Sequence, residues 1–157
     1  MSSSTDGSCI TWDLTRFVRN NCFFASSQFS VALYHPDESQ LLTTGTDRKV
    51  TVWDVVDGSA IRITDASPSA EVNSLAISHD GSAFVSAGGD KIVKVWNYEE
   101  GRAYFYGFGH SGAIKRVAIS PDQKSIVTVG AEGSVFIWKM PHVPSTLVVP
   151  TAPASRK

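Results

Sequence analysis

The sequence has no apolar run that approaches the roughly 18 to 20 residues of a transmembrane helix. Its N-terminus, MSSSTDGSC, is polar and carries neither a basic stretch nor an apolar core, so no secretory signal is visible. No segment places apolar residues at i, i+3, i+4 and i+7, the pattern of an amphipathic helix. These absences predict a chain with no membrane partner and no helical architecture.

Cysteine and histidine are scarce. Cys9 and Cys22 are the two cysteines of the chain, and a disulfide framework needs more of them and a secretory context, so we expect free thiols. The four histidines, at positions 35, 79, 110 and 142, lie far apart, and no CxxC or HxxxH spacing occurs. We therefore expect no metal and no cofactor.

The chain also lacks an excess of charge of either sign. Its formal net charge is −1 at pH 7, and no face of alternating cations and aromatics is visible, so nucleic acid is not an expected partner. A chain of 157 residues that is 42% hydrophobic and 18% charged has the composition of an ordinary globular domain or part of one.

What the sequence does contain is a repeat of 41 to 43 residues. Its markers are Trp12, Trp53, Trp96 and Trp138. An acidic residue precedes each tryptophan by six positions, and these are Asp6, Asp47, Asp90 and Glu132. Four matches in phase indicate a repeated structural unit.

Each unit is predicted to be built from antiparallel strands. Four residues before the acidic residue, the last three units carry Thr43, Ser86 and Thr128. Further upstream, Pro-Asp and Asp-Gly turn signals separate short runs rich in Val, Ile, Thr and aromatic residues. A more variable strand follows the tryptophan, around 61–64 and 103–108. The pattern predicts an all-β chain.

Four strands in about 40 to 45 residues, ending on Trp-Asp, resemble the WD40 β-propellers. The resemblance covers residues 6–140 and implies a structural hydrogen-bond network within each unit. In the last unit the matching residues are His110, Thr128, Glu132 and Trp138, with Glu132 where Asp is usual. The other two units match at Thr43, Asp47 and Trp53 and at Ser86, Asp90 and Trp96. Phe24-Ala25 and Ser67-Pro68 stand where those two units would carry Gly-His.

The propeller is expected to be incomplete, with about three and a quarter blades. Residues 6–14 supply the third strand of a blade whose first two strands are missing, and fuller blades follow at about 25–65, 68–108 and 110–140. Propellers usually have four to eight blades, so we expect the remaining blades of a longer chain, or a second chain, to complete the ring. The partial propeller ends near residue 140; a Pro-rich tail follows at 141–157, with 145–149 a possible last strand.

The motifs YHPDES, WDVVDG and GHSGAI resemble, more narrowly, the C-terminal repeats of the cilia- and flagella-associated WD40 proteins of axonemal doublet microtubules. This resemblance implies a non-catalytic scaffold in the cytoskeleton of motile cilia and flagella, with tubulin and other axonemal proteins as partners. The alternative is a generic WD40 adaptor or substrate receptor that binds peptides in a signalling or ubiquitin-ligase complex.

No catalytic site is expected, because His110 and Glu132 have no nucleophile with its own base nearby. The candidate partner contacts are the cations in the acidic turns, Arg48, Lys49 and Lys91, which would meet an acidic partner.

Overall fold

A computed structural model describes residues 1–142. The described chain forms fourteen strands in four antiparallel sheets and contains no helix, which confirms the all-β prediction. The N-terminal sheet contains β1 (Ser2–Ser3), β2 (Ser8–Asp13) and β3 (Val18–Phe24). The second contains β4 (Phe29–Tyr34), β5 (Gln40–Gly45), β6 (Lys49–Asp54) and β7 (Ala60–Asp65).

The third sheet contains β8 (Val72–Ile77), β9 (Ala83–Gly88), β10 (Val93–Asn97) and β11 (Ala103–Gly107). The last contains β12 (Ile114–Ile119), β13 (Ser125–Gly130) and β14 (Val135–Lys139). The possible strand at 145–149 lies outside the described residues.

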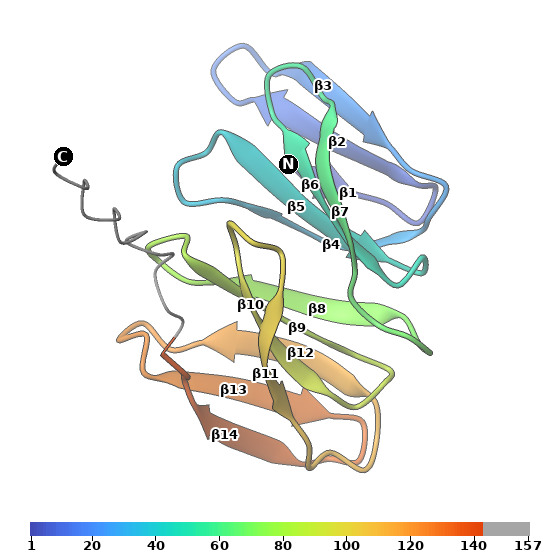
Figure 1. The fold of residues 1–157 in the computed structure, drawn as a ribbon. Helices are drawn as coiled ribbons and strands as arrows, with labels where there is room; N and C mark the ends of the chain where they lie inside the picture. The colour runs from blue at the N-terminus through green and yellow to red at the C-terminus, as the bar shows by residue number, and fades with distance from the viewer. Residues whose placement is uncertain (143–157) are drawn as a thin grey trace, which may run out of the picture.

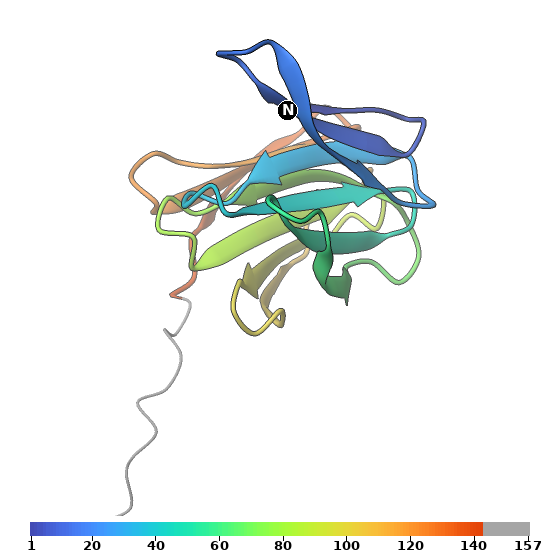
Figure 2. The ribbon, with the colours of Figure 1, turned by 90° about the horizontal axis from the view of Figure 1, so that it is seen from above.

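The sheets succeed one another along the chain, from the N-terminal sheet at the top of Figure 1 to the last sheet at the bottom. Their first strands lie next to one another: β8 contacts both β4 and β12, and β1 contacts β4. The strands β7 and β11 form the outer edges of their sheets. Seen from above in Figure 2, the N-terminal sheet covers one end of the stack.

The N-terminal sheet departs from expectation at one point. We expected its first two strands to be missing, but the two-residue strand β1 pairs with β2 through Ser2 and Ile10 and through Ser3 and Cys9. Its polar sequence, Ser-Ser, carries none of the β-branched or aromatic residues that mark strands. The residue types of this segment therefore gave no indication that it would pair with β2.

The acidic turns have the same backbone in all four sheets. The residue after the acidic one has a positive φ in each, at Gly7 (83°), Arg48 (65°), Lys91 (66°) and Gly133 (83°). Glycine adopts this conformation without a steric penalty, whereas Arg48 and Lys91 bear Cβ atoms. The turn is thus a conserved element of the repeat geometry within this chain, and two of its four copies are strained.

The core lies between the sheets, in three clusters. The cluster between the third and last sheets joins Val93 and Val95, both 0% exposed, to Ile114 and Ile126. The cluster between the second and third sheets is built in the same way, as is the one between the first and second. In the second and third sheets the tryptophan side faces the preceding sheet, because Trp53 packs on Phe23 and Trp96 lies in the cluster that contains Val52.

Polar side chains also connect neighbouring sheets at equivalent positions. Asn21 of β3 donates from Nδ2 to the carbonyls of Val55 (2.6 Å) and Val56 (2.9 Å). Arg62 of β7 donates to the carbonyls of Tyr98 and Glu99 in the corresponding turn of the next sheet. The outer strand of one sheet therefore holds the turn after the tryptophan of the next.

Within residues 1–142, no strand covers the two outer faces of the stack. On the last sheet, Val135 and Ile137 are 61% and 74% exposed, although they occupy the register positions of the fully buried Val93 and Val95. At the other end, Trp12 is 45% exposed. The described residues thus present an apolar face at each end.

Candidate functional site

Each tryptophan of the repeat donates from Nε1 to a hydroxyl on the neighbouring strand. Trp53 donates to Thr43 (2.7 Å), Trp96 to Ser86 (2.8 Å) and Trp138 to Thr128 (2.8 Å). The fourth bond runs from Trp12 to Ser2 (3.0 Å). Sequence reasoning missed Ser2, although it precedes Asp6 by the same four residues as the other hydroxyls precede their acidic residues.

The last sheet holds the longest hydrogen-bond chain, the His110 network of His110, Thr128, Glu132 and Trp138. His110 Nδ1 lies 2.5 Å from Glu132 Oε1, and its Nε2 lies 2.7 Å from Thr128 Oγ1. With a proton on Nδ1, the order runs from the indole N–H to Thr128, from the Thr128 hydroxyl to His110, and from His110 to the carboxylate. The longer Glu132 side chain therefore still reaches His110.

The Glu132 carboxylate is held in its charged form. Hydrogen bonds from the Ser134 hydroxyl and from His110 lower its pKa from 4.5 to about 2. The backbone N–H of Gly112 also donates to Glu132 Oε2 at 3.2 Å. Such an arrangement ties two turns to each other and leaves the ring of His110, which is 7% exposed, with no access to a substrate.

The third sheet satisfies its acidic residue with a lysine instead of a histidine. Lys94 Nζ donates to Asp90 Oδ2 (2.6 Å) and to the carbonyl of Ala66 (2.5 Å). Both side chains of this ion pair are nearly buried, at 6% exposed for Lys94 and 5% for Asp90. Lys94 occupies the register position of Phe136, which packs on His110 in the last sheet at 4.6 Å between ring centroids.

In the second sheet the acidic residue, Asp47, contacts neither a histidine nor a lysine side chain among the described residues. Asp47 accepts a bond from the backbone N–H of Lys49 (3.2 Å), and its own N–H donates to Ser27 Oγ (3.2 Å). Of its three predicted network residues, the structure joins Thr43 and Trp53 and leaves Asp47 as a turn residue.

Two of the three candidate cations, Arg48 and Lys91, lie in exposed turns, and the third, Lys49, begins β6. The Arg48 guanidinium donates to the carbonyl of Pro68 at 2.9 Å, so it bridges the turn of the second sheet to the segment that enters the third. Lys49 and Lys91 are exposed. Arg48 and Lys91 belong to neighbouring turns of the same kind, and Arg48 is also a structural contact.

The described residues give little indication of a metal site or of a reactive thiol. No group of three or more His, Cys, Asp or Glu side chains within 1–142 could hold a metal ion. Cys9 and Cys22 are free, and burial raises the pKa of Cys9 to about 11, which keeps it a thiol. No helix of the described part is long and apolar enough to cross a membrane.

The model of the WD domain, G-beta repeat, matches residues 17–54, 58–97 and 104–139. The chain belongs to the WD40 repeat family. Its sheets are blades of an incomplete β-propeller, and each of the three matched segments ends one residue after a tryptophan, at 53, 96 or 138. This family is one of protein-interaction modules.

The chain is homologous to cilia- and flagella-associated protein 52 over most of its length. It is 59% identical to that protein of Chlamydomonas reinhardtii over 138 residues, 88% of this chain. Identity to the proteins of Sus scrofa and Homo sapiens is 48% and 46%, each over 90% of this chain. The chain spans only 22% to 23% of the length of these relatives.

Proposed function

We propose that this chain is a non-catalytic interaction module of a scaffold protein in the cytoskeleton of cilia and flagella. The observation that carries the proposal is the 59% identity to cilia- and flagella-associated protein 52 of Chlamydomonas reinhardtii over 88% of the chain. Similarity of that degree covers the blades themselves as well as the repeat markers, and so it favours this scaffold over a generic WD40 adaptor.

The geometry supports a role based on shape and multiple contacts. Within 1–142 every buried side-chain nitrogen and oxygen has a hydrogen-bond partner, and polar clamps such as that of Arg62 fix one blade against the next. A rigid surface needs little ordering when it binds, which reduces the entropic cost of association. Within 1–142 the hydroxyls that the repeat places opposite its tryptophans bond the indole N–H groups, so these polar groups serve the rigidity of the blades.

Tubulin and other axonemal proteins are the proposed partners, and the exposed turns with Arg48, Lys49 and Lys91 are the proposed contacts. These cations lie in or beside the equivalent turns of two successive sheets, and their attraction to an acidic surface would weaken as salt rises. Replacing all three by Glu in the full-length protein should weaken co-sedimentation with microtubules and flatten its salt dependence. Unchanged co-sedimentation would remove these turns from the interface.

Localisation tests the scaffold itself. A tagged full-length protein is expected to remain with axonemes after extraction at high salt, because a structural component is held by many contacts. A protein that is diffuse in the cytoplasm and fully extracted, while it still retains peptides in pull-down experiments, would contradict the scaffold and favour the adaptor.

A further inference from the structure

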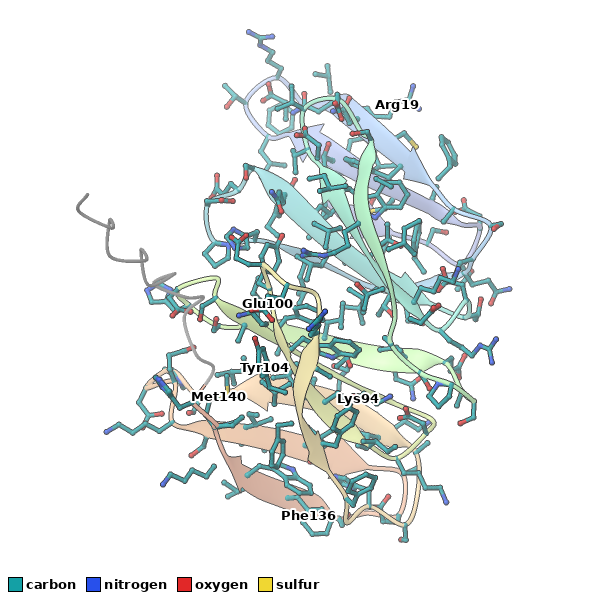
Figure 3. The ribbon with its side chains drawn as sticks, in the orientation of Figure 1. Arg19, Lys94, Glu100, Tyr104, Phe136 and Met140 are labelled. Carbon is teal, nitrogen blue, oxygen red and sulfur yellow. The ribbon has the colours of Figure 1, made fainter. Side chains whose placement is uncertain are left out.

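The last sheet has one strand fewer than the two full blades. Its strand β14 occupies the third position, yet within residues 1–142 no strand pairs with its outer edge. The equivalent strands β6 and β10 pair on both sides, because β7 and β11 lie outside them. Figure 3 shows this end of the molecule, with Phe136 on β14 and Met140 just after it. An unpaired apolar strand at a sheet edge is a template for the addition of another strand.

The missing strand leaves the tryptophan of the last blade partly open to solvent. Trp53 and Trp96 are 8% and 6% exposed, whereas Trp138 is only half-buried. Trp138 still packs in the cluster between the third and last sheets, so the preceding blade is not what it lacks. In the two full blades a small residue of the fourth strand lies opposite the tryptophan. The last blade is therefore incomplete at its outer edge.

The sequence after β14 has the composition of the missing strand. β7 and β11 each begin six residues after the strand before them ends. The same spacing, counted from Lys139 at the end of β14, leads to Ser145. Residues 145–149 lie outside the described residues and read Ser-Thr-Leu-Val-Val, a run rich in β-branched residues. The chain thus carries a candidate fourth strand of its own.

The register of the full blades also suits this segment. In both of them an alanine of the fourth strand lies opposite the tryptophan. By the same spacing Ser145, which is also small, falls opposite Trp138. One position before the tryptophan, the third blade pairs two apolar residues of β10 and β11, and the equivalent pair here is Ile137 and Leu147. Residues 145–149 therefore fit the outer edge of β14 in residue type and in register.

The turns that return the chain from the third strand to the fourth share two features. Each opens on a side chain whose Oδ1 atom accepts a backbone N–H of the turn, at 2.8, 2.7 and 2.8 Å in Asp13, Asp54 and Asn97. Four residues later each turn has a positive φ, at Phe17 (55°), Gly58 (76°) and Gly101 (64°). The acceptor and the left-handed residue together reverse the chain tightly.

The last blade lacks the residues for both features. Lys139 stands at the acceptor position, and its ammonium group can only donate. Val143 stands at the position of positive φ, where a β-branched residue is strongly disfavoured. Pro144 follows directly, and a proline shifts the residue before it to extended backbone. The sequence therefore favours an extended connection at 140–144, which spans about 17 Å, over the tight return.

A strand that cannot return to its own sheet is suited to exchange between copies. The extended connection carries residues 145–149 away from the β14 strand to which they are joined. A second copy offers the same outer edge of β14, and the pairing there is the one that the full blades make within one chain. Exchange of an identical element in this way joins two copies with few new contacts.

We propose that two copies of this chain exchange residues 145–149, and that each segment becomes the fourth strand of the last blade in the other copy. The exchange pairs both free edges in one closed dimer. Because it is bimolecular, it increases with protein concentration. The proposal goes beyond the proposed function and does not rest on it, since it follows from the strand edge and the turn residues alone.

Cysteine cross-linking between distinguishable copies tests the exchange on the 157-residue chain. Ile137→Cys and Leu147→Cys are made in separate chains with tags of different length, and the two chains are refolded together and oxidised. A disulfide that joins the two chains is expected. Thr146→Cys is the matched control, because the equivalent residues Ile61 and Tyr104 have no register partner on β6 and β10. Its cross-link to the Ile137→Cys chain should be at least about tenfold weaker, and equal yields would overturn the register.

A single chain tests the alternative in which the segment returns to its own blade. The double variant Ile137→Cys with Leu147→Cys should give disulfide-linked dimers and little internal disulfide. Lys139→Asn with Val143→Gly and Pro144→Ser, added to this variant, installs turn residues of the full blades and should convert the dimers to monomers with an internal disulfide. A monomer with an internal disulfide before the turn substitutions are made would overturn the exchange, as would the absence of any cross-link in either experiment.

Axonemal retention of the full-length protein reports on the proposed function and not on the exchange. A retained protein that gives no cross-link at these positions would overturn the exchange and leave the proposed function intact. Cross-linked copies of a protein that is fully extracted from axonemes would support the exchange and refute the proposed function alone.

Discussion

The third and last blades share strand order and turn geometry but differ in what covers them. Val93 and Val95 are 0% exposed, whereas Val135 and Ile137 at the same register positions are 61% and 74% exposed. The sequence pattern is the same, apolar residues alternating along the strand. The burial of a face in this fold is therefore decided by its neighbouring blade and not by the strand itself.

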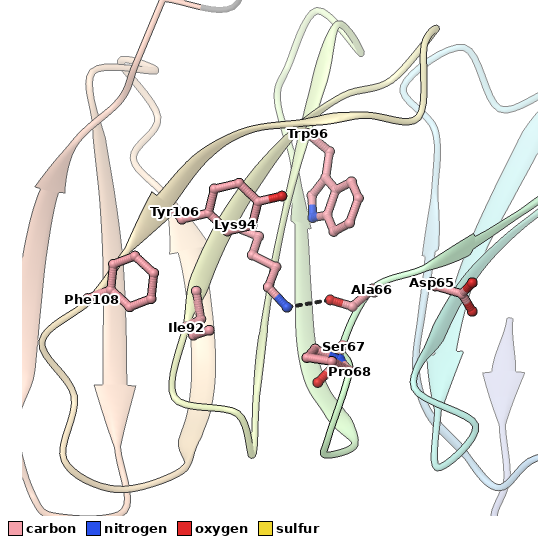
Figure 4. Close-up of a pocket in the computed structure, with 9 residues that line it drawn as sticks. All are labelled: Asp65, Ala66, Ser67, Pro68, Ile92, Lys94, Trp96, Tyr106 and Phe108. Carbon is pink, nitrogen blue, oxygen red and sulfur yellow. Dashed lines mark hydrogen bonds between the residues drawn. The ribbon is translucent and has the colours of Figure 1, made fainter.

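The same two blades satisfy their acidic residues by different chemistry. Glu132 is bound by a histidine from the segment before β12, and Asp90 by a lysine from its own sheet. The first solution ties two segments of chain together and fills the blade, while the second leaves a groove beside Lys94, between Pro68 and Tyr106 (Figure 4). Blades of this repeat thus keep the same strand order with different partners for the acidic residue.

The largest effect should come from a charge on the covered face. Val95→Asp places a carboxylate between two blades with no partner, and it is expected to lower the free energy of unfolding by at least about 4 kcal/mol. Ile137→Asp is the matched control at the same register position, and a change within about 0.5 kcal/mol is expected there. Urea unfolding of the 157-residue chain, at a protein concentration at which it is monomeric, measures both. Equal losses would refute the comparison.

The buried ion pair should give the next effect. Lys94→Met leaves the Asp90 carboxylate buried without its cation and should cost about 3 to 5 kcal/mol. The double variant Asp90→Asn with Lys94→Met should recover most of that loss, because no charge remains unpaired. A double-mutant cycle by urea unfolding measures the coupling, and additive losses would show that the pair does not act as a unit.

Low pH should reduce the stability that the last blade gains from Glu132. The pKa of Glu132 is lowered from 4.5 to about 2, so its stabilising effect is present above pH 4.5 and is lost as pH falls from 4.5 toward 2. Glu132→Gln should remove this part of the pH dependence. Thermal unfolding of both proteins across that range measures it, and the other carboxylates contribute equally to the two curves. Parallel curves would contradict the assignment.

The smallest effect concerns the strained turns. Lys91→Gly should raise the free energy of unfolding by about 0.5 to 1 kcal/mol, because glycine has no Cβ to clash at positive φ. Arg48→Gly should raise the free energy of unfolding by less, because it also removes the hydrogen bond from Arg48 to the carbonyl of Pro68. Gly133→Lys in the last blade is the reverse control and should destabilise. A stabilising Gly133→Lys would be inconsistent with the strain at this turn.

Much of this fold could be predicted from the sequence, because the markers of the repeat recur at fixed spacings and so fix the position of each strand. The spacing of Trp53, Trp96 and Trp138 predicted the third strand of each blade, and the turn signals predicted the strands before it. The N-terminal blade was harder, because β1 has two serines and no apolar residue. Its Ser2 bond to Trp12 could have been found by applying the offset of the other hydroxyls.

The groove beside Lys94 could not have been predicted in the same way. The loss of the histidine at Pro68 was visible, but the space it leaves depends on which side chain turns inward from the neighbouring strand. Lys94 faces the same side as Thr51 and Phe136 in their blades, and only its contacts with Asp90 and Ala66 show that it is buried. A charged residue in a strand is ordinarily expected at the surface.

Light scattering coupled to size-exclusion chromatography tests the central claim, that each blade face of this propeller needs a neighbour. The 157-residue chain, with its uncovered faces, is expected to associate increasingly with concentration, and Val135→Lys with Ile137→Lys is expected to shift it toward monomer. A chain that stays monomeric at every concentration, with or without these substitutions, would contradict the account.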